Sequence, residues 1–357
     1  MALNLLLLSF SFSLSVLFSF TPSESQVVPA MFVFGDSLVD VGNNNYLSVS
    51  LNKVDFPPYG IDFPSKVATG RFSNGKNTAD FLAEKVGLPT SPPYLSLESN
   101  KNRASLQTGV SFASGGARIT DDNAGPLHES IHLTRQVDYF SQVHAELKQQ
   151  LGSSGVQELL SKSLFPFVIG SNDMLGYFRS NHSNPQDFVD SLALKLSDQL
   201  KRVYGYGARK FVMVGLAAIG CCPSVRKNID GEACNTEINY WSAKYNEGLK
   251  LMLQNLASEL KDISYSYFDS YSIYTKIIEK PASYGFAEVK TACCGLGHLR
   301  AQITCQPLSL YCANRNDHVF WDASHPTEAC ARIIMENMFH GSSKYTYPMN
   351  VKTLAGV

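Results

Sequence analysis

The sequence predicts an α/β fold in which helices cover both faces of a parallel sheet. Short apolar runs alternate along the chain with helical patterns, and this alternation is typical of such folds. Hydrophobic residues make up 44% of the 357 residues, which is enough for a substantial core. No linker divides the chain, so we expect one domain over residues 26–357. The runs predicted to form strands are 30–34, 109–113, 165–169, 210–216 and 263–268.

Three segments carry the clearest helical signals. The first has Asn184 as its cap and Pro185 at its first helical position, and glycines follow its end. The second runs from about 236 to 260, and we expect the third to start at Pro326. The side chains predicted to face the core are Phe188, Leu192, Leu196, Leu200 and Val203 in the first segment, Ile238, Trp241, Tyr245, Leu249, Met252, Leu256 and Leu260 in the second, and Ala329, Ile333 and Met338 in the third.

Residues 1–25 are predicted to be a secretory signal peptide. An uncharged run of Leu, Phe, Val and Ser fills 5–20, and cleavage after Ser25 would leave Gln26 first. A membrane anchor is the alternative, but the run is short for a span and serines interrupt it. We therefore expect a secreted, extracellular protein without stable membrane insertion after cleavage. In such a protein, the sequon at Asn181 is a candidate glycosylation site.

Eight cysteines fit an oxidising compartment, in which most of them should pair. Their clustering favours one disulfide within 221–234 and others within 293–312. Zinc binding is the alternative, but the adjacent cysteine pairs lack the two-residue gap of finger-type sites. Disulfides are therefore predicted, and no metal site.

The charge balance gives no reason to expect nucleic acid or an anionic membrane as a partner. The chain carries 30 basic and 31 acidic residues and no run of like charge. One long segment, 42–76, is rich in Asn, Pro and Gly, and a loop of that length often serves as a lid or a binding wall. An ordered surface insertion is the alternative for this segment. Oligomeric state stays open.

Chemically informative residues occur near both ends of the chain. The strand predicted at 30–34 ends on a turn that contains Ser37, at the edge of the sheet where α/β folds place reactive groups. Far along the chain, one short loop carries Asp322 and His325. Ester hydrolysis at a serine needs a hydroxyl, a base and a residue that orients the base. We therefore expect Ser37 to be the nucleophile, His325 the base and Asp322 its partner.

Two further segments offer donors to the oxyanion that forms when an ester is attacked. The strand at 109–113 is followed by Gly115-Gly116, where backbone N–H groups can approach a ligand closely. The strand at 165–169 is followed by Asn172, whose side-chain amide is a donor. An ordinary turn and a helix cap are the alternatives. Asp36 and Asp40, which flank the serine, are interpreted as turn and helix-start residues.

Taken together, these blocks resemble the plant-type secreted GDSL esterase/lipases of the SGNH-hydrolase superfamily. The resemblance implies a triad of Ser37, Asp322 and His325, and an oxyanion hole of Ser37, Gly116 and Asn172. It extends from about residue 29 to 339 and includes the blocks 34–45, 69–76, 109–119, 169–173, 220–223, 293–295 and 319–331.

The same resemblance implies a flavodoxin-like three-layer α/β/α fold around a five-stranded parallel sheet, the SGNH hydrolase fold. It also implies a carboxylic ester or lipid substrate and no metal or other cofactor, and for a plant protein a place in the apoplast or cell wall. Cys222 and Cys330 look additional to the family's usual set. They either pair with each other or remain buried thiols.

Three alternatives to hydrolysis remain at this stage. An alcohol could replace water at deacylation, which would make the protein a transacylase, or the fold could bind a lipid or glycan without catalysis. A zinc protease is the third, because His128 and His132 match an H-E-x-x-H pattern and Glu146 could be a third ligand. Polar and apolar residues alternate up to a helix starting near Thr134, which favours an extended segment with two solvent-facing histidines instead.

Overall fold

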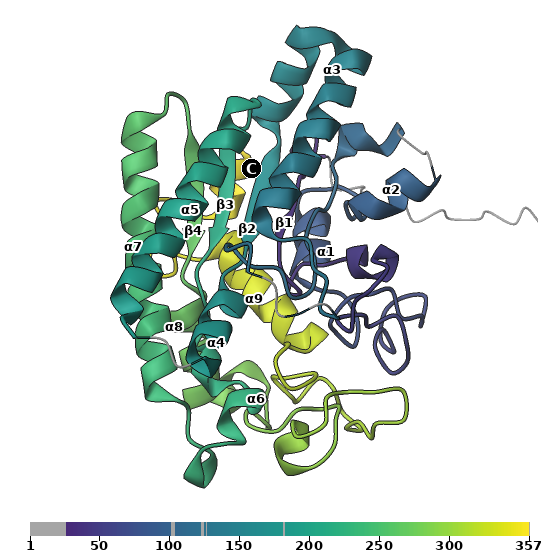
Figure 1. Ribbon diagram of the computed structural model, residues 1–357, viewed down its shortest axis with the longest axis vertical. Helices are drawn as coiled ribbons and strands as arrows, with labels where there is room; N and C mark the ends of the chain where they lie inside the picture. Colours follow the sequence, from purple (N-terminus) through teal and green to yellow (C-terminus); the bar gives the residue numbers. More distant parts are fainter. Residues whose placement is uncertain (1–25, 101–103, 123–124, 126, 181–182, 357) are drawn as a thin grey trace, which may run out of the picture.

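A five-stranded sheet forms the centre of the molecule (Figure 1). The computed structural model describes residues 26–100, 104–122, 125, 127–180 and 183–356. The first four strands are parallel, as expected, and β5 runs antiparallel to β4. This last strand was not predicted, because two residues carry no detectable alternation. In sheet order the strands are β1 (Phe34–Gly35), β2 (Leu164–Val168), β3 (Lys210–Val214), β4 (Ser264–Phe268) and β5 (Thr346–Tyr347).

The segment predicted as a strand at 109–113 lies beside β1, on the side away from β2. It pairs in parallel through an isolated bridge between Val33 and Ser111. The Val33 N–H donates to the Val110 carbonyl (2.9 Å), and the Phe112 N–H donates back to Val33 (2.8 Å). Counted with this segment, the parallel strands have the flavodoxin-like order 2-1-3-4-5. In that order the connections change direction between β1 and β2, and α/β proteins bind ligands at such a switch point.

Helices form two layers around the sheet. In one layer α3 (Leu133–Lys162), α5 (Pro185–Gly205) and α7 (Thr236–Glu259) pack side by side, with α3 against β1 and α7 against β4 (Figure 1). In the other, α9 (Glu328–His340) is in contact with its neighbours α1 (Thr78–Lys85), α8 (Ser270–Glu279) and α10 (Val351–Ala355). The remaining helices are α2 (Tyr94–Asn100), α4 (Ser171–Arg179) and α6 (Pro223–Arg226).

Two of the three predicted helices are confirmed, and the start of the third is wrong. Asn184 caps α5, and its side chain accepts from the backbone N–H of the residue three further on. Pro326 lies outside α9, because it is paired with Phe320 in a tight hairpin. Thr327 is the cap instead, and its Oγ1 accepts the Cys330 N–H at 3.2 Å. The core-facing side therefore shifts, so that Ala329 and Ile333 are only partly buried while Ala331, Ile334, Met335 and Met338 are buried.

A second, smaller core packs beneath the C-terminal loops and contains two of the three disulfides. It joins Val54 and Tyr59 of the long 42–76 segment to Trp321 and to four cysteines. The bridges are Cys221–Cys234, Cys293–Cys312 and Cys294–Cys305, which confirms the predicted clustering. Cys222 and Cys330 are buried free thiols.

Candidate active site

Ser37 is held at the switch point by a turn that requires glycine. The N–H of Asp36 donates to the carbonyl of Val168 in β2 (2.9 Å), which pulls the turn against the neighbouring strand. A Cβ on Gly35 would lie 2.4 Å from that same carbonyl oxygen, so no side chain fits there. The Gln136 side chain, from α3, bonds both the N–H and the carbonyl of Gly35 at 2.9 and 2.8 Å. The serine is thereby fixed at the carboxyl edge of the sheet.

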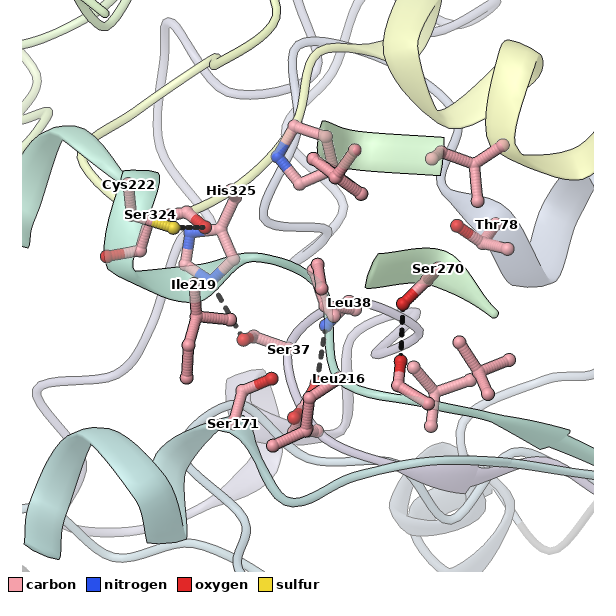
Figure 2. A pocket seen from close by; sticks show the side chains of 18 of the residues that line it. Ser37, Leu38, Thr78, Ser171, Leu216, Ile219, Cys222, Ser270, Ser324 and His325 are labelled. Carbon is pink, nitrogen blue, oxygen red and sulfur yellow. Dashed lines mark hydrogen bonds between the residues drawn. The ribbon is translucent and has the colours of Figure 1, made fainter. Parts of the chain in front are cut away.

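His325 comes within hydrogen-bond distance of that serine from 288 residues further along the chain. Its Nε2 lies 2.8 Å from Ser37 Oγ, as the dashed line in Figure 2 shows. On its other side, Nδ1 lies 2.8 Å from each carboxylate oxygen of Asp322. A hydroxyl, an imidazole and a carboxylate therefore form one continuous row, and the imidazole can take a proton from the hydroxyl.

The loop that carries Asp322 and His325 is closed by its own backbone. The Trp321 N–H donates to the His325 carbonyl at 2.8 Å. Within this hairpin, Oδ1 of Asp322 accepts the N–H groups of Ser324 and His325, both at 2.9 Å. Asp322 and His325 are therefore aligned by hydrogen bonds within their own loop, independently of contacts with the rest of the protein.

Burial and charge work against each other on the two ionisable groups. Burial raises the pKa of Asp322, but His325 and the hydrogen bonds to the carboxylate lower it by more, so this carboxyl has a pKa below its usual range. Burial lowers the pKa of His325, and the charge and hydrogen bond of Asp322, followed by the charge of Asp36, raise it above the ordinary histidine value. An ionised Asp322 beside a basic imidazole is the arrangement needed to accept the serine proton.

Two of the three predicted oxyanion donors, Gly116 and Asn172, belong to segments that are joined by one hydrogen bond. Asn172, in the first turn of α4, donates one amide hydrogen to the Ala117 carbonyl (3.0 Å) and keeps a second. Gly116 precedes Ala117 directly in the chain. Within the part of the chain that the structure describes, the N–H groups of Ser37 and Gly116 donate to no protein acceptor. Ser37 and Asn172 line the cavity described below, whereas Gly116 is outside its lining.

The glycine turn is anchored by residues that flank the serine. Asp40 accepts the Gly115 N–H through Oδ2 (2.9 Å), and Asn44 and Ser130 donate to the Gly115 carbonyl at 2.9 and 2.7 Å. Gly116 has φ +82°, and a Cβ there would meet Ser130 Oγ at 2.6 Å. Asp40 also accepts the N–H groups of residues 42 and 43, which confirms its predicted role at a helix start. Its bond to Gly115 is an additional contact, with a residue far away in the sequence.

An apolar cavity of about 100 Å³ opens beside the serine. Figure 2 shows Ser37 and His325 between Ile219, Cys222 and Ser324 on one side and Thr78 and Ser270 on the other. The aliphatic walls of the cavity come from β2, from α4, from α9 and from the segment that follows β3. They include Leu38, Leu175, Leu216, Ile334 and Met338.

Asp36 is a buried acid on the wall of this cavity. Its Oδ1 accepts the Leu38 N–H (3.0 Å), which confirms its predicted turn role. Its Oδ2 is buried and, among the described residues, has no hydrogen-bond partner. Burial, opposed by that one hydrogen bond, raises the pKa of Asp36 to about 7. No pattern in the sequence predicts a carboxyl that titrates near neutral pH here.

Two aromatic residues of the site were missed. Phe72 belongs to the block 69–76 that carries the family resemblance, but no motif in the sequence assigns a role to it or to Tyr59. The hydroxyl of Tyr59 donates to Asp322 Oδ2 at 2.8 Å, and the ring of Phe72 packs on the imidazole of His325. Both belong to the segment 42–76, for which a lid or binding wall was one of two expectations. The sequence signals of this segment were its length and its content of Asn, Pro and Gly, and neither distinguishes one aromatic residue from another.

The other predicted features fall outside this site. Asn181 lies outside the described residues. Over those residues, no group of three or more His, Cys, Asp or Glu could hold a metal ion, so the zinc-protease alternative finds no site there. His128 and His132 do precede α3 in an extended segment, but His132 is only 8% exposed and accepts the Arg118 N–H (3.1 Å). The expectation that both histidines face solvent is therefore wrong.

A Ser-His-Asp row at the carboxyl edge of a parallel sheet is the arrangement of serine-dependent hydrolases. The family model for GDSL-like Lipase/Acylhydrolase matches residues 31–338. One GDSL esterase/lipase of Arabidopsis thaliana is 48% identical over 338 residues, which cover 92% of this chain and 90% of the relative. Another from the same plant is 37% identical over 338 residues, with coverage of 93% and 86%. The chain belongs to the GDSL lipase/acylhydrolase family, and it is an acylhydrolase.

Proposed function

We propose that this protein is a secreted serine esterase that hydrolyses carboxylic esters through an acyl-enzyme on Ser37. The observation that carries the proposal is the row of 2.8 Å contacts from Ser37 through His325 to Asp322, at the switch point of the sheet. Both contacts are within the distance over which a proton can be transferred.

The reaction proceeds in two halves. Ser37 Oγ attacks the ester carbonyl carbon while His325 Nε2 takes the hydroxyl proton, and Asp322 stabilises the imidazolium. The bond to the alcohol then breaks, and His325 passes its proton to the leaving oxygen. Water attacks the acyl-enzyme in the second half, with its proton going to His325 and then back to Ser37 as the carboxylic acid leaves.

The oxyanion is stabilised by the N–H groups of Ser37 and Gly116 and by the second amide hydrogen of Asn172. The hydrogen bonds of these donors support this role. The two backbone N–H groups have no acceptor among the described residues, and the Asn172 amide uses only one of its two hydrogens. Donors that are fixed before substrate binds need no reorganisation during the reaction, which is why they accelerate it.

The acyl chain of the substrate lies in the apolar cavity beside Ser37. Aliphatic walls favour a hydrocarbon chain there, because burial of apolar surface is the main source of its binding energy. We propose acyl or lipid esters as the substrate class on this basis. The alcohol part is not specified by the cavity.

We further propose that residues 1–25 are a signal peptide and that 26–357 form one extracellular domain. Three disulfides support an oxidising compartment, and one large hydrophobic cluster extends from Val28 to Ala355. In the described part of the chain, no helix combines the length and apolar character that a membrane crossing requires.

The test is hydrolysis of p-nitrophenyl esters by the mature chain, with Ser37→Ala as the control. Wild type should turn over, and the variant should lose turnover while still folding. A fluorophosphonate probe should label wild type at Ser37 only. Turnover that survives in Ser37→Ala would exclude the serine mechanism. A folded wild type that neither turns over nor labels would indicate a binding protein, and labelling with turnover only when an alcohol is added would indicate a transacylase.

A further inference from the structure

Tyr59 is part of the smaller core and contacts Asp322 there. Its hydroxyl donates to Oδ2 of that aspartate at 2.8 Å across a separation of 263 residues. The tyrosine is 4% exposed, so water does not compete for this hydrogen bond. The contact therefore links the long 42–76 segment directly to the acid of the proposed triad.

The two oxygens of Asp322 are satisfied differently. Oδ1 accepts backbone N–H groups from its own loop, those of Ser324 and His325. Oδ2 accepts the hydroxyl of Tyr59, and both oxygens face Nδ1 of His325. Among the described residues, Tyr59 is the one side chain besides His325 that donates to this carboxylate. Without it, Oδ2 would keep only the imidazole as a partner in a buried site, and burial raises the pKa of Asp322.

The phenol ring of Tyr59 is itself held in place. The ring of Phe56 packs edge-on at 5.5 Å, and the indole of Trp321 packs edge-on at 6.0 Å. Trp321 is adjacent to Asp322 in the chain, so the ring and the carboxylate share one support. Cys293 and Cys294 donate their N–H groups to the carbonyls of Phe320 and Trp321, which ties the disulfide-linked loops to the same strand.

Resting on the proposed function, we propose that Tyr59 is a positioning residue for the triad. It keeps Asp322 ionised and fixes the plane of its carboxylate, and so it sets the basicity of His325. Burial, together with the charge of Asp322, raises the pKa of Tyr59 well above its ordinary value. The tyrosine therefore stays protonated at working pH and donates without exchanging its proton.

The test is Tyr59→Phe, which removes one oxygen and leaves the ring. Turnover of p-nitrophenyl butyrate should fall roughly ten- to a hundredfold in kcat with little change in KM, as expected for the loss of one hydrogen bond to a buried charge. The acid limb of kcat/KM should also move to higher pH, by roughly half a unit or more. A less stabilised carboxylate makes the His-Asp pair take up its proton more readily, whichever residue carries it.

The matched control is Tyr311→Phe. Tyr311 packs on the same tryptophan, with 6.5 Å between ring centroids, and its hydroxyl makes no hydrogen bond to Asp322. Tyr311→Phe should keep the acid limb of kcat/KM at the wild-type pH. Tyr59 has no positioning role if Tyr59→Phe leaves kcat and the acid limb of kcat/KM unchanged. The same conclusion follows if kcat falls while the acid limb stays at the wild-type pH.

A measurement without turnover separates this idea from the proposed function. The Nδ1–H proton of His325 should give a downfield NMR signal whose pH midpoint rises in Tyr59→Phe. A shifted midpoint would support the role of Tyr59 even if no ester were hydrolysed, and an unchanged one would overturn it. If Tyr59→Phe fails to fold, the double variant Tyr59→Phe/Asp322→Asn should fold, because it no longer has the buried negative charge that the Tyr59 hydroxyl stabilises. A double variant that also fails to fold would mean that the hydroxyl acts on the structure and not through Asp322.

Discussion

The ring of Phe72 packs against the imidazole of His325, with 4.9 Å between ring centroids and 40° between the ring planes. The tip of the same phenyl ring lies close to Gly115, where a Cβ would be 2.3 Å from Cζ of the ring. Phe72 thus fills the space between the proposed base and the glycine turn. It restricts the imidazole to the orientation in which Nε2 faces Ser37.

We predict that Phe72→Leu lowers kcat for p-nitrophenyl butyrate roughly three- to tenfold, the worth of one well-packed aromatic pair. The physical reason is that His325 gains rotational freedom and spends less time aligned with the serine. Phe63→Leu is the matched control, since Phe63 is in the same segment but packs against the guanidinium of Arg71 (4.7 Å). Equal losses in the two variants would show that the effect is a general loosening of the segment.

The second amide hydrogen of Asn172 gives a sharper prediction. Asn172→Ala should reduce kcat by roughly 10²–10³, because a donor fixed at the developing oxyanion is lost. KM should change little, since the ground-state carbonyl uses this donor weakly. Asn350→Ala is a suitable control, because Asn350 caps α10 with a bond of 2.9 Å to the Thr353 N–H and is not part of the site. Near-native turnover in Asn172→Ala would remove Asn172 from the oxyanion hole.

Asp36 should make stability depend on pH. Burial, opposed by its bond to Leu38, raises the pKa of Asp36 to about 7, so the folded protein resists ionising this group. In the unfolded chain it ionises near pH 4. Asp36 therefore costs no stability below about pH 4 and costs progressively more up to about pH 7, by roughly 4 kcal/mol at most. Wild-type stability should fall over that window on account of this residue.

We predict that Asp36→Asn gains stability over wild type as the pH rises from 4 to 7.5, measured as the free energy of unfolding in urea. Asn keeps an oxygen for the Leu38 N–H and cannot ionise. Asp40→Asn should be less stable than Asp36→Asn at every pH, because both Asp40 oxygens accept N–H groups and an amide nitrogen cannot. Burial raises the pKa of Asp40 to about 6, so the loss in Asp40→Asn should shrink as the pH rises from 4 to 6. The acid limb of kcat/KM should also move to lower pH in Asp36→Asn, since the charge of Asp36 helps to raise the pKa of His325. A stability difference that does not vary with pH would contradict this account.

Much of the fold was predictable because its main helices are long and periodic and its central strands are continuous apolar runs. The regular spacing of Leu192, Leu196 and Leu200 located α5, and its cap and first-turn proline were both correct. The start of α9 was misjudged because Pro326 and Thr327 both carry helix-start signals, and only the hairpin to Phe320 decides between them. Such a hairpin is a tertiary contact, and no local pattern predicts it.

Within the site, the sequence predicted the residues that follow a predicted strand or belong to a recognisable motif, and it missed those that pack from the irregular segment 42–76. Ser37, Asn172 and His325 each follow a recognisable element or motif. Tyr59 and Phe72 occur in an irregular segment, where nothing distinguishes a tyrosine that bonds Asp322 from one that faces solvent. The burial of Asp36 was likewise unpredictable, because it depends on the carbonyl of Val168 and the cavity wall around it.

The size of the cavity predicts which acyl chains are accepted. At about 100 Å³ it is somewhat smaller than a cavity of about 150 Å³ that holds a benzene ring, so it takes a short acyl chain. Across p-nitrophenyl esters from acetate to laurate, kcat/KM should therefore peak at roughly four to eight carbons, since each further methylene up to that length buries apolar surface and later ones do not.

Ile334 allows this relation to be tested in both directions, because it projects from α9 into the cavity wall and is only 6% exposed. Ile334→Phe should shorten the preferred chain and leave acetate turnover almost unchanged, whereas Ile334→Ala should lengthen it at a stability cost of about 2–5 kcal/mol. The adjacent Ile333 is partly buried and is not in the lining, so Ile333→Ala provides a control that should keep the wild-type profile. A profile that shifts equally in the control, or in neither Ile334 variant, would place the acyl chain elsewhere. Opposite shifts in the two Ile334 variants would place it against α9.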